Sequence, residues 1–325
     1  MKHLALVLAC LASPALAGVD EALDEHVLPR VETFRQQAER LAERASEDCT
    51  APALRAPYQD LFDAWMGISH LRFGPLEEDG RALAIGFWPD TRGMVQRTVS
   101  RLIADEDPAA GDPEAFAEVS IAGRGLFALE RLLYDESLSD YGPEDYACSL
   151  ATAVARDLSR MAEGLSADWN DYQGLMKDAG ENTTYLSEKE AAQALYTALM
   201  TGLEFTKDQR LGRPLGTFDR PRPTWAEAYR SDRPLRNVVL SLEALRELSR
   251  TLSDDPIPVT EAAFADVLDV AAGLDDPRLA GVEDPSERLK IEILQQRVDL
   301  LQDDVAGEIG GALGLTQGFN AQDGD

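Results

Sequence analysis

Residues 123–135 read "GRGLFALERLLYD" and repeat leucine at intervals of three and four residues. Leu126, Leu129 and Leu133 fall on one side of an α-helix, because successive helical residues turn by about 100°. The apolar stripe continues upstream, so we expect one helix over about residues 112–134. Most of the chain has the same period of about 3.6 residues and lacks the alternation that is typical of strands. The pattern therefore predicts an all-α protein.

Glu130 lies beside the leucine stripe of this predicted helix and borders the core. A buried carboxylate costs several kcal/mol unless it is paired, hydrogen-bonded, protonated or bound to a metal. Arg124 and Arg131 are not three or four residues away from Glu130, which is the spacing that lets side chains meet along a helix. We therefore expect a partner from another part of the chain. Either an arginine of another helix pairs with Glu130, or Glu130 is a ligand in a site between helical bundles.

The N-terminus has the features of a cleavable export signal. Residues 1–17, "MKHLALVLACLASPALA", combine a basic start, an apolar run and a small-residue end. The alternative is lipidation at Cys10, but the apolar segment before it is shorter than a signal normally requires. No later segment is long and apolar enough to cross a bilayer. We expect a periplasmic protein that does not span the membrane.

The chain is strongly acidic, with 59 Asp and Glu against 31 Lys and Arg and a net charge of −28. Such a surface repels nucleic acid and anionic lipid. This charge excludes a nucleic-acid partner and suits a soluble protein of the cell envelope.

Only Cys49 and Cys148 remain after removal of the predicted signal. Two cysteines in an oxidising compartment favour one disulfide, and the alternative is a pair of buried free thiols. Neither a C-x-x-C motif nor a Cys/His cluster is present, so the sequence does not support a zinc ribbon or a thiol-redox site.

The chain divides into two helical halves of similar size, and a polar stretch at about residues 170–185 marks the boundary. Residues 18–170 form the predicted N-terminal bundle, and residues 171–325 form the C-terminal bundle. Ser187 and Glu190 have the spacing of a capping box that opens the second half. Two similar halves suggest a duplication, although no clear sequence repeat relates them. A further helix is predicted to begin at about residue 57. The other predicted helices cover about residues 20–45, 92–105, 143–169, 234–252, 260–274 and 285–313.

Catalytic motifs are missing from the sequence. The predicted mature chain has two histidines, His26 and His70, and neither an H-E-x-x-H helix nor a G-x-S-x-G elbow. This composition argues against a metallopeptidase and against a serine or cysteine hydrolase.

Several segments together resemble the imelysin-like family of bacterial envelope proteins, in the branch described as predicted periplasmic lipoproteins. The segments are "FDAWMGISHLRFGP", "GFWPD", "GRGLFALERLLY", "RLGRPLG", "AEAYRS" and "GFNAQDGD". The resemblance implies two helical bundles related by duplication. It also implies a link to iron uptake, in a family once classed with peptidases. Many members carry G-x-H-x-x-E on one helix, whose His and Glu can reach one metal ion. Gly125, Phe127 and Glu130 match that motif here, so phenylalanine replaces the histidine and the metal motif is incomplete.

The resemblance and the motif positions suggest a ligand pocket between the halves. We assign eight residues to it: His70, Arg72, Asp90, Arg124, Glu130, Arg210, Arg230 and Ser231. Arginines and carboxylates in such a pocket could hold an anionic ligand or close it with salt bridges. Glu130 and His70 are the candidate ligands for a metal ion such as iron.

The expected role is therefore non-enzymatic. We expect an exported protein that binds a ligand, another envelope protein or a metal-uptake partner in a path related to iron or another metal. The alternatives are a peptidase of the imelysin type and a scaffold for envelope assembly.

Overall fold

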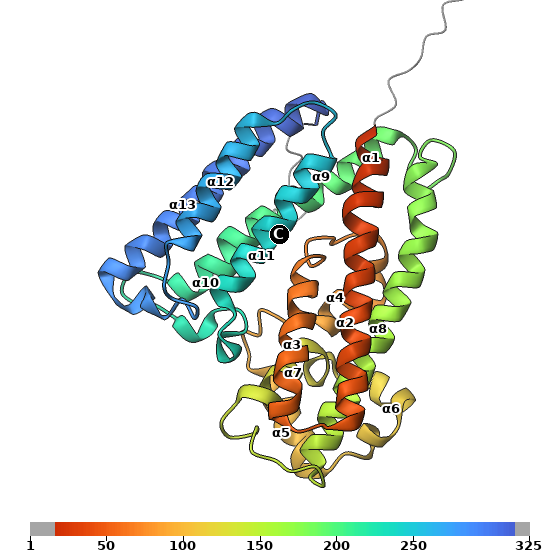
Figure 1. Ribbon diagram of the computed structural model, residues 1–325, viewed down its shortest axis with the longest axis vertical. Coiled ribbons are helices and arrows are strands. Elements are labelled where there is room, and N and C mark those ends of the chain that lie inside the picture. The colour runs from red at the N-terminus through yellow and green to blue at the C-terminus, as the bar shows by residue number, and fades with distance from the viewer. Residues whose placement is uncertain (1–16, 316–325) are drawn as a thin grey trace, which may run out of the picture.

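The structure is a computed structural model that describes residues 17–315. The predicted signal up to residue 16, Cys10 and the terminal "GFNAQDGD" lie outside the described residues. Within residues 17–315 the regular elements are helices, and the one pairing of extended backbone is the isolated bridge between Thr217 and Arg220. The predicted all-α class, with two helical bundles packed together, is confirmed (Figure 1).

The first bundle is built on one long continuous helix, in which a π-helical turn, η1, joins two α-helical parts. Its segments are α1 (Ala17–Glu21), η1 (Ala22–Val27) and α2 (Leu28–Glu47). α2 packs along both α3 (Ala51–Met66) and the 32-residue α8 (Tyr146–Lys177) (Figure 1). The apolar stripe of α2 is buried as its period predicts: Val31, Phe34, Ala38, Leu41 and Ala45.

Short helices between α3 and α8 complete the first bundle. They are α4 (Arg81–Ile85), α5 (Met94–Asp105), α6 (Pro113–Ala117) and α7 (Gly125–Tyr134). Turns of 3-10 helix connect them: η2 (Gly74–Leu76), η3 (Glu78–Gly80), η4 (Pro108–Gly111) and η5 (Ile121–Gly123).

The expected single helix over residues 112–134 is wrong, because the chain breaks between α6 and α7. Arg124 has an extended backbone, and Gly125 has a φ of +71°. A Cβ atom at Gly125 would also overlap the backbone carbonyl oxygens of Ala84 and Ile85. Glycine alone combines this φ with so close a backbone approach. The break separates Phe116 from the face that carries Glu130.

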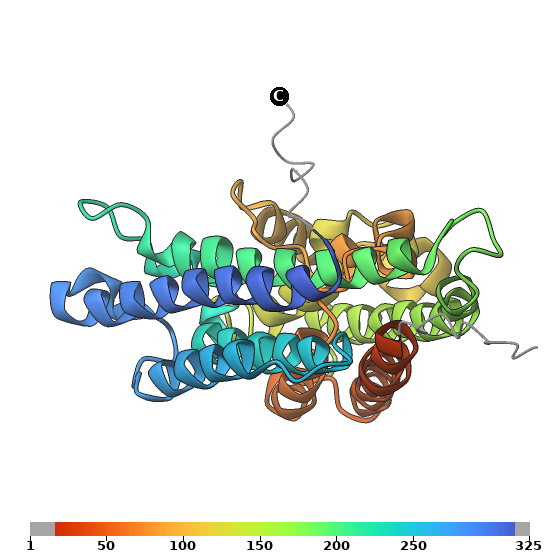
Figure 2. The same ribbon diagram turned by 90° about the horizontal axis from the view of Figure 1, so that it is seen from above.

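The second bundle contains three long helices and a fourth that continues into a short one. They are α9 (Glu188–Phe205), followed by the π-helical turn η6 (Thr206–Leu211) and α10 (Gly212–Leu215), then α11 (Pro234–Thr251), α12 (Pro258–Ala272) and α13 (Pro285–Val305) with η10 (Ala306–Gly310). The 3-10 turns are η7 (Pro223–Trp225), η8 (Tyr229–Ser231) and η9 (Ala280–Glu283). α12 and α13 pack side by side along the outer edge (Figure 2).

Ser187 caps α9 as predicted. Its hydroxyl oxygen accepts a hydrogen bond from the amide of Glu190 at 3.3 Å. The Glu190 carboxylate accepts from the amide of Leu186, one residue before the position in a standard capping box.

The two bundles share one continuous core of buried apolar side chains. α8 crosses the predicted boundary at residue 170 and ends at Lys177. The first helix belongs to both bundles, because α1 contacts α9 and η1 contacts α11, in addition to the contacts of α2 with α3 and α8. The division into halves at residues 170 and 171 and their origin by duplication stay predictions.

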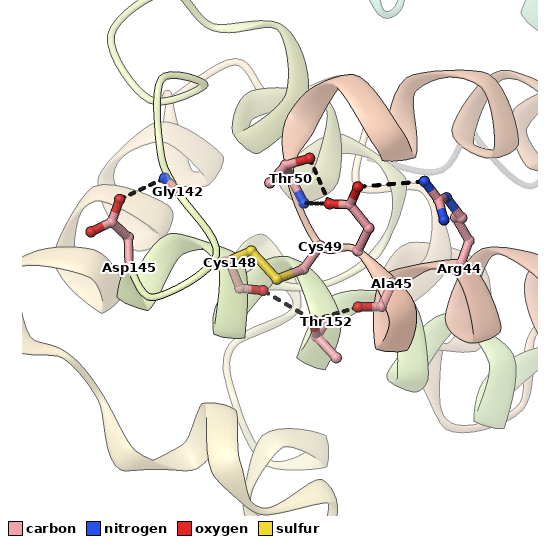
Figure 3. Close-up of a disulfide and its surroundings, with 9 residues drawn as sticks. Arg44, Ala45, Cys49, Thr50, Gly142, Asp145, Cys148 and Thr152 are labelled. Atoms are coloured by element: carbon pink, nitrogen blue, oxygen red, sulfur yellow. Dashed lines mark hydrogen bonds and ion pairs between the residues drawn. A yellow bond between two sulfur atoms is a disulfide. The ribbon is translucent and has the colours of Figure 1, made fainter.

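The disulfide between Cys49 and Cys148 is present, with Cα atoms 5.1 Å apart (Figure 3). It joins the turn between α2 and α3 to the first turn of α8. The hydroxyl of Thr152 lies at the same junction, 3.0 Å from the carbonyl oxygen of Cys148 and 3.2 Å from that of Ala45. The predicted pairing is confirmed.

Candidate functional site

Glu130 lies on α7 and contacts the second bundle through Ser231, the last residue of η8. Its Oε1 accepts hydrogen bonds from the amide of Ser231 at 3.1 Å and from the hydroxyl at 2.8 Å. The Glu130 side chain is 3% exposed, and burial raises the pKa of its carboxyl above the usual range. The partner thus comes from another part of the chain, as the helix spacing predicts, and it is a serine rather than an arginine.

Gln59 of α3 holds the same turn from the other side. Its side-chain amide donates to the carbonyl of Ser231 at 3.1 Å and to the hydroxyl of Tyr134 at 3.0 Å. The carbonyl oxygen of the Gln59 side chain accepts from Arg233, which is completely buried and also donates to Asp63 Oδ1 at 2.6 Å. A buried guanidinium keeps its charge at tolerable cost only with such partners.

The hydrogen bonds continue from Arg233 into the second bundle. Arg233 Nε donates to Asn237 at 3.0 Å, and the Asn237 amide donates to Glu227 Oε2 at 3.1 Å. The same Glu227 oxygen accepts from Arg210 Nε at 2.8 Å, and Arg210 Nη2 reaches the hydroxyl of Ser69 at 3.3 Å. A polar network therefore extends from α7 to the turn after α3 through the junction of the bundles. We call these residues the interbundle network: Glu130, Ser231, Gln59, Arg233, Asn237, Glu227, Arg210 and Ser69.

His70 follows Ser69 and pairs with His26 of η1, whose Nε2 lies 3.0 Å from His70 Nε2. Both rings are buried, and burial lowers the pKa of each imidazole, that of His70 well below its usual range. At this separation one ring donates a hydrogen and the other accepts it, so the contact needs at least one neutral ring. Glu247 of α11 lies 3.8 Å from His26 Nδ1. The pair lies at the junction, since a Cβ atom at Gly202 of α9 would come 3.0 Å from the Cβ of His70.

The other predicted site residues lie around this network or outside it. Arg230 forms an ion pair with Asp135 at 3.4 Å, beside Glu130. Arg124 is paired with the buried Asp157 of α8 through two hydrogen bonds, of 2.7 and 3.0 Å. Asp90 accepts hydrogen bonds from the first amides of α5, including those of Met94 and Val95 at 2.9 Å.

Arg72 has no ion-pair partner among residues 17–315. Its Nε donates to the carbonyl of Ser69 at 2.9 Å, and its guanidinium lies 6.0 Å from the Trp65 ring. Burial lowers the pKa of Arg72, and the positive charge of Arg210 adds to this effect.

Sequence reasoning missed six members of the junction: His26, Gln59, Ser69, Glu227, Arg233 and Asn237. His26 had a signal, since it follows Ala22 by four residues on the apolar side of the first helix. Among the others only Arg233 and Asn237 are four residues apart, and the remaining side-chain contacts of the network join residues 10 to 174 positions apart.

The residues at the family's metal position do not fit a metal centre. Phe127 has no donor atom, and its ring packs against that of Phe62 at 5.7 Å. The nearby carboxylate of Glu130 is engaged by Ser231, and His70 is engaged by His26. Across residues 17–315, no group of three or more His, Cys, Asp or Glu side chains is arranged to hold a metal ion. In the same part of the chain, no helix is both long and apolar enough to span a membrane.

Comparison with known families identifies the chain, since the family model for imelysin, named after peptidase family M75, matches residues 25–305. The chain belongs to the imelysin family. Among solved structures, this imelysin-family protein is similar to an imelysin-like protein from Psychrobacter arcticum 273-4, with a TM-score of 0.78 and 20% identity. That match covers 96% of this chain and 100% of the other.

A second solved structure is a putative iron-regulated protein A precursor from Parabacteroides distasonis ATCC 8503, with a TM-score of 0.70 and 12% identity. That match covers 92% of this chain and 97% of the other. At these identities the two structures establish a shared fold. No curated protein matches the chain.

Proposed function

We propose that this imelysin-family protein is an exported, non-enzymatic binding protein of the cell envelope that acts in a path related to iron or another metal. The family membership, the signal-like N-terminus and the similarity in fold to a protein described as iron-regulated support the proposal. The periplasm is the compartment that fits the predicted signal and the disulfide.

The contact between Glu130 and Ser231 carries the proposal. In the family motif this carboxylate lies one helical turn from a histidine, and the pair can reach a metal ion. Here Phe127 occupies the histidine position, and the carboxylate instead joins the two bundles through a serine. A carboxyl group held in this way can bind or position a ligand, and Phe127 supplies no base beside it.

The first test is the metal content of the protein purified from periplasm without chelators, measured by elemental mass spectrometry. Direct metal binding by Glu130 and His70 would require both side chains to leave their present partners. If they are ligands, the wild-type protein should contain near-stoichiometric metal, and Glu130→Gln and His70→Gln should each lose it. Glu163→Gln, at an exposed position of α8, is the control and should retain the metal. Titration calorimetry with ferrous, ferric, copper and zinc ions gives a second measure. A protein that binds none of them would refute direct metal binding and leave a ligand or partner role.

A peptidase role is the alternative that the name of the matched family suggests. Cleavage of unfolded protein substrates by the pure protein, with or without added metals, would support this alternative and contradict the non-enzymatic proposal. A scaffold role predicts instead that the protein co-purifies with an envelope complex and that this association survives Glu130→Gln.

A further inference from the structure

Three arginines and three aromatic rings form a row that runs from the surface to the interbundle network, with the rings of Trp88 and Phe205 in direct succession, 5.8 Å apart. We call this row the arginine–aromatic ladder: Arg222, Trp225, Arg213, Trp88, Phe205 and Arg210. The guanidinium carbon of Arg222 lies 3.8 Å from the centre of the Trp225 ring. That of Arg213 lies 5.9 Å from the Trp225 ring and 6.0 Å from the Trp88 ring. These distances are within the range of cation–π attraction.

Within the described part of the chain, the arginine at the inner end of the ladder is paired with a carboxylate, and those at the outer end are not. At the inner end Arg210 lies 4.8 Å from the Phe205 ring and is paired with Glu227. At the outer end neither Arg213 nor Arg222 forms an ion pair with any residue in the range 17–315. Arg213 donates only to the neutral side chain of Gln209, at 2.7 Å. Burial lowers the pKa of Arg213, so its charge is partly removed from water without a carboxylate in compensation.

This arrangement is unusual because the chain is rich in carboxylates. The whole sequence has 59 acidic and 31 basic residues, whereas residues 210–225 contain four arginines and one aspartate. Within this segment positive charge therefore predominates, and the acidic residue of the neighbouring element η9, which packs against η7 and α10, is Glu283. At physiological ionic strength charges more than about 8 Å away are largely screened, so the local balance matters more than the net charge.

Backbone hydrogen bonds fix the segment that carries Arg222 and Trp225 at the outer end of the ladder. The turn after α10 begins at Gly216, which has a φ of +54°, and closes through the bridge between Thr217 and Arg220. The amide of Arg222 donates to the carbonyl of Pro214 at 2.8 Å, and the amide of Trp225 donates to the carbonyl of Arg222 at 2.9 Å. Trp225 is 40% exposed, so a ligand can reach this end of the ladder.

We propose that Arg222, stacked on Trp225, and Arg213, 5.9 Å from the centre of the same ring, form a binding site for a small polycarboxylate, the class of molecule that also chelates ferric iron. The inference deepens the proposed function and rests on it, because it names the ligand class of a binding protein. The stacked face of a guanidinium contacts the ring, while its edge keeps N–H groups that can donate two parallel hydrogen bonds to a carboxylate. Two guanidinium groups near one indole ring suit a ligand with more than one carboxylate.

Titration calorimetry of the full mature chain tests the site, with citrate, ferric citrate and inorganic phosphate as separate probes. We expect citrate to bind and added salt to weaken the binding, since the contacts are ionic. Arg213→Gln and Arg222→Gln should each weaken it about tenfold, the loss expected for one charge-assisted contact. Arg222→Lys should also weaken binding, because lysine keeps the charge but lacks the planar fork. Arg101→Gln is the matched control, an exposed arginine of α5 outside the ladder, and should leave binding unchanged.

The proposal is overturned if neither citrate nor ferric citrate binds, or if Arg101→Gln weakens binding as much as Arg222→Gln. Tighter binding of phosphate than of citrate would contradict the carboxylate assignment. The result is separable from that for the proposed function. Citrate binding by a protein that contains no metal would uphold the ladder site and remove the support for direct metal binding. Metal bound through Glu130, without any citrate binding, would support direct metal binding and refute the ladder site.

Discussion

Replacement of Glu130 should reveal whether its carboxyl acts through charge or through shape and hydrogen bonding. Glu130→Gln keeps an oxygen at the position of Oε1, which can still accept from the amide and hydroxyl of Ser231. Burial already disfavours the charged carboxylate, so loss of the charge costs little. We expect Glu130→Gln to lower the free energy of unfolding by at most about 1 kcal/mol.

Glu130→Ala should be far more damaging. It leaves the amide of Ser231 without its acceptor, at about 1 to 3 kcal/mol for a buried group, and opens a cavity on α7. Together these effects predict a loss of about 3 to 5 kcal/mol. Ser231→Ala removes only the hydroxyl contact, and a double-mutant cycle with Glu130→Ala should show a coupling of about 1 to 2 kcal/mol.

Urea unfolding at neutral pH, followed by circular dichroism and by tryptophan fluorescence, measures these differences. The two signals must coincide before a single free energy is assigned, because the chain has two bundles. Glu163→Ala, at an exposed position, is the control and should change stability by less than about 0.5 kcal/mol. Equal losses for Glu130→Gln and Glu130→Ala would refute the reasoning, since they would mean that the charge itself holds the site.

Three further predictions concern stability. His26 and His70 have lowered pKa values in the fold, so the stability that depends on their neutral forms is complete above the unfolded value of 6.5 and is lost as the pH falls below it. As the pH is lowered from 6.5, the free energy of unfolding should therefore decrease by up to about 1.4 kcal/mol per pH unit for each histidine. Urea unfolding at several pH values measures this dependence, and the double variant His26→Gln/His70→Gln should show a weaker dependence on pH. Cys49→Ser/Cys148→Ser opens a loop whose ends are 99 residues apart and should cost about 4 kcal/mol; an unchanged melting temperature would contradict this. Gly125→Ala should destabilise the protein by more than about 4 kcal/mol, because its φ is +71° and its Cβ would overlap two carbonyl oxygens; soluble, normally melting protein would show that the turn can rearrange.

The predictions from sequence succeeded where the determining interactions are local. The stripe of α2 follows from its own period, and Ser187 accepts from an amide three residues ahead. The disulfide is a long-range contact, but it was predictable because the predicted mature chain has two cysteines. The cap by Asp90 was also local and could have been recognised, since it accepts from amides four and five residues ahead.

The failures arose where distant parts of the chain meet. The apolar period runs through residues 118–124 without interruption, and the break appears only because the backbone of α4 approaches Gly125. Glycine permits a positive φ but does not require it, so the sequence alone does not indicate this turn. Likewise, His26 and His70 are 44 residues apart, and Arg233 and Gln59 are 174 residues apart. No helical period relates such positions.

The position of the first helix in both bundles has a consequence for how the chain is made. Arg30 on this helix is paired with Glu247, 217 residues later. A ribosome that adds about 5 to 20 residues per second leaves roughly ten to forty seconds between the two. For most of that interval α11, which will contact this helix, has not been made. The newborn chain therefore cannot complete its fold until residue 247 has been made, when about three quarters of the chain exists.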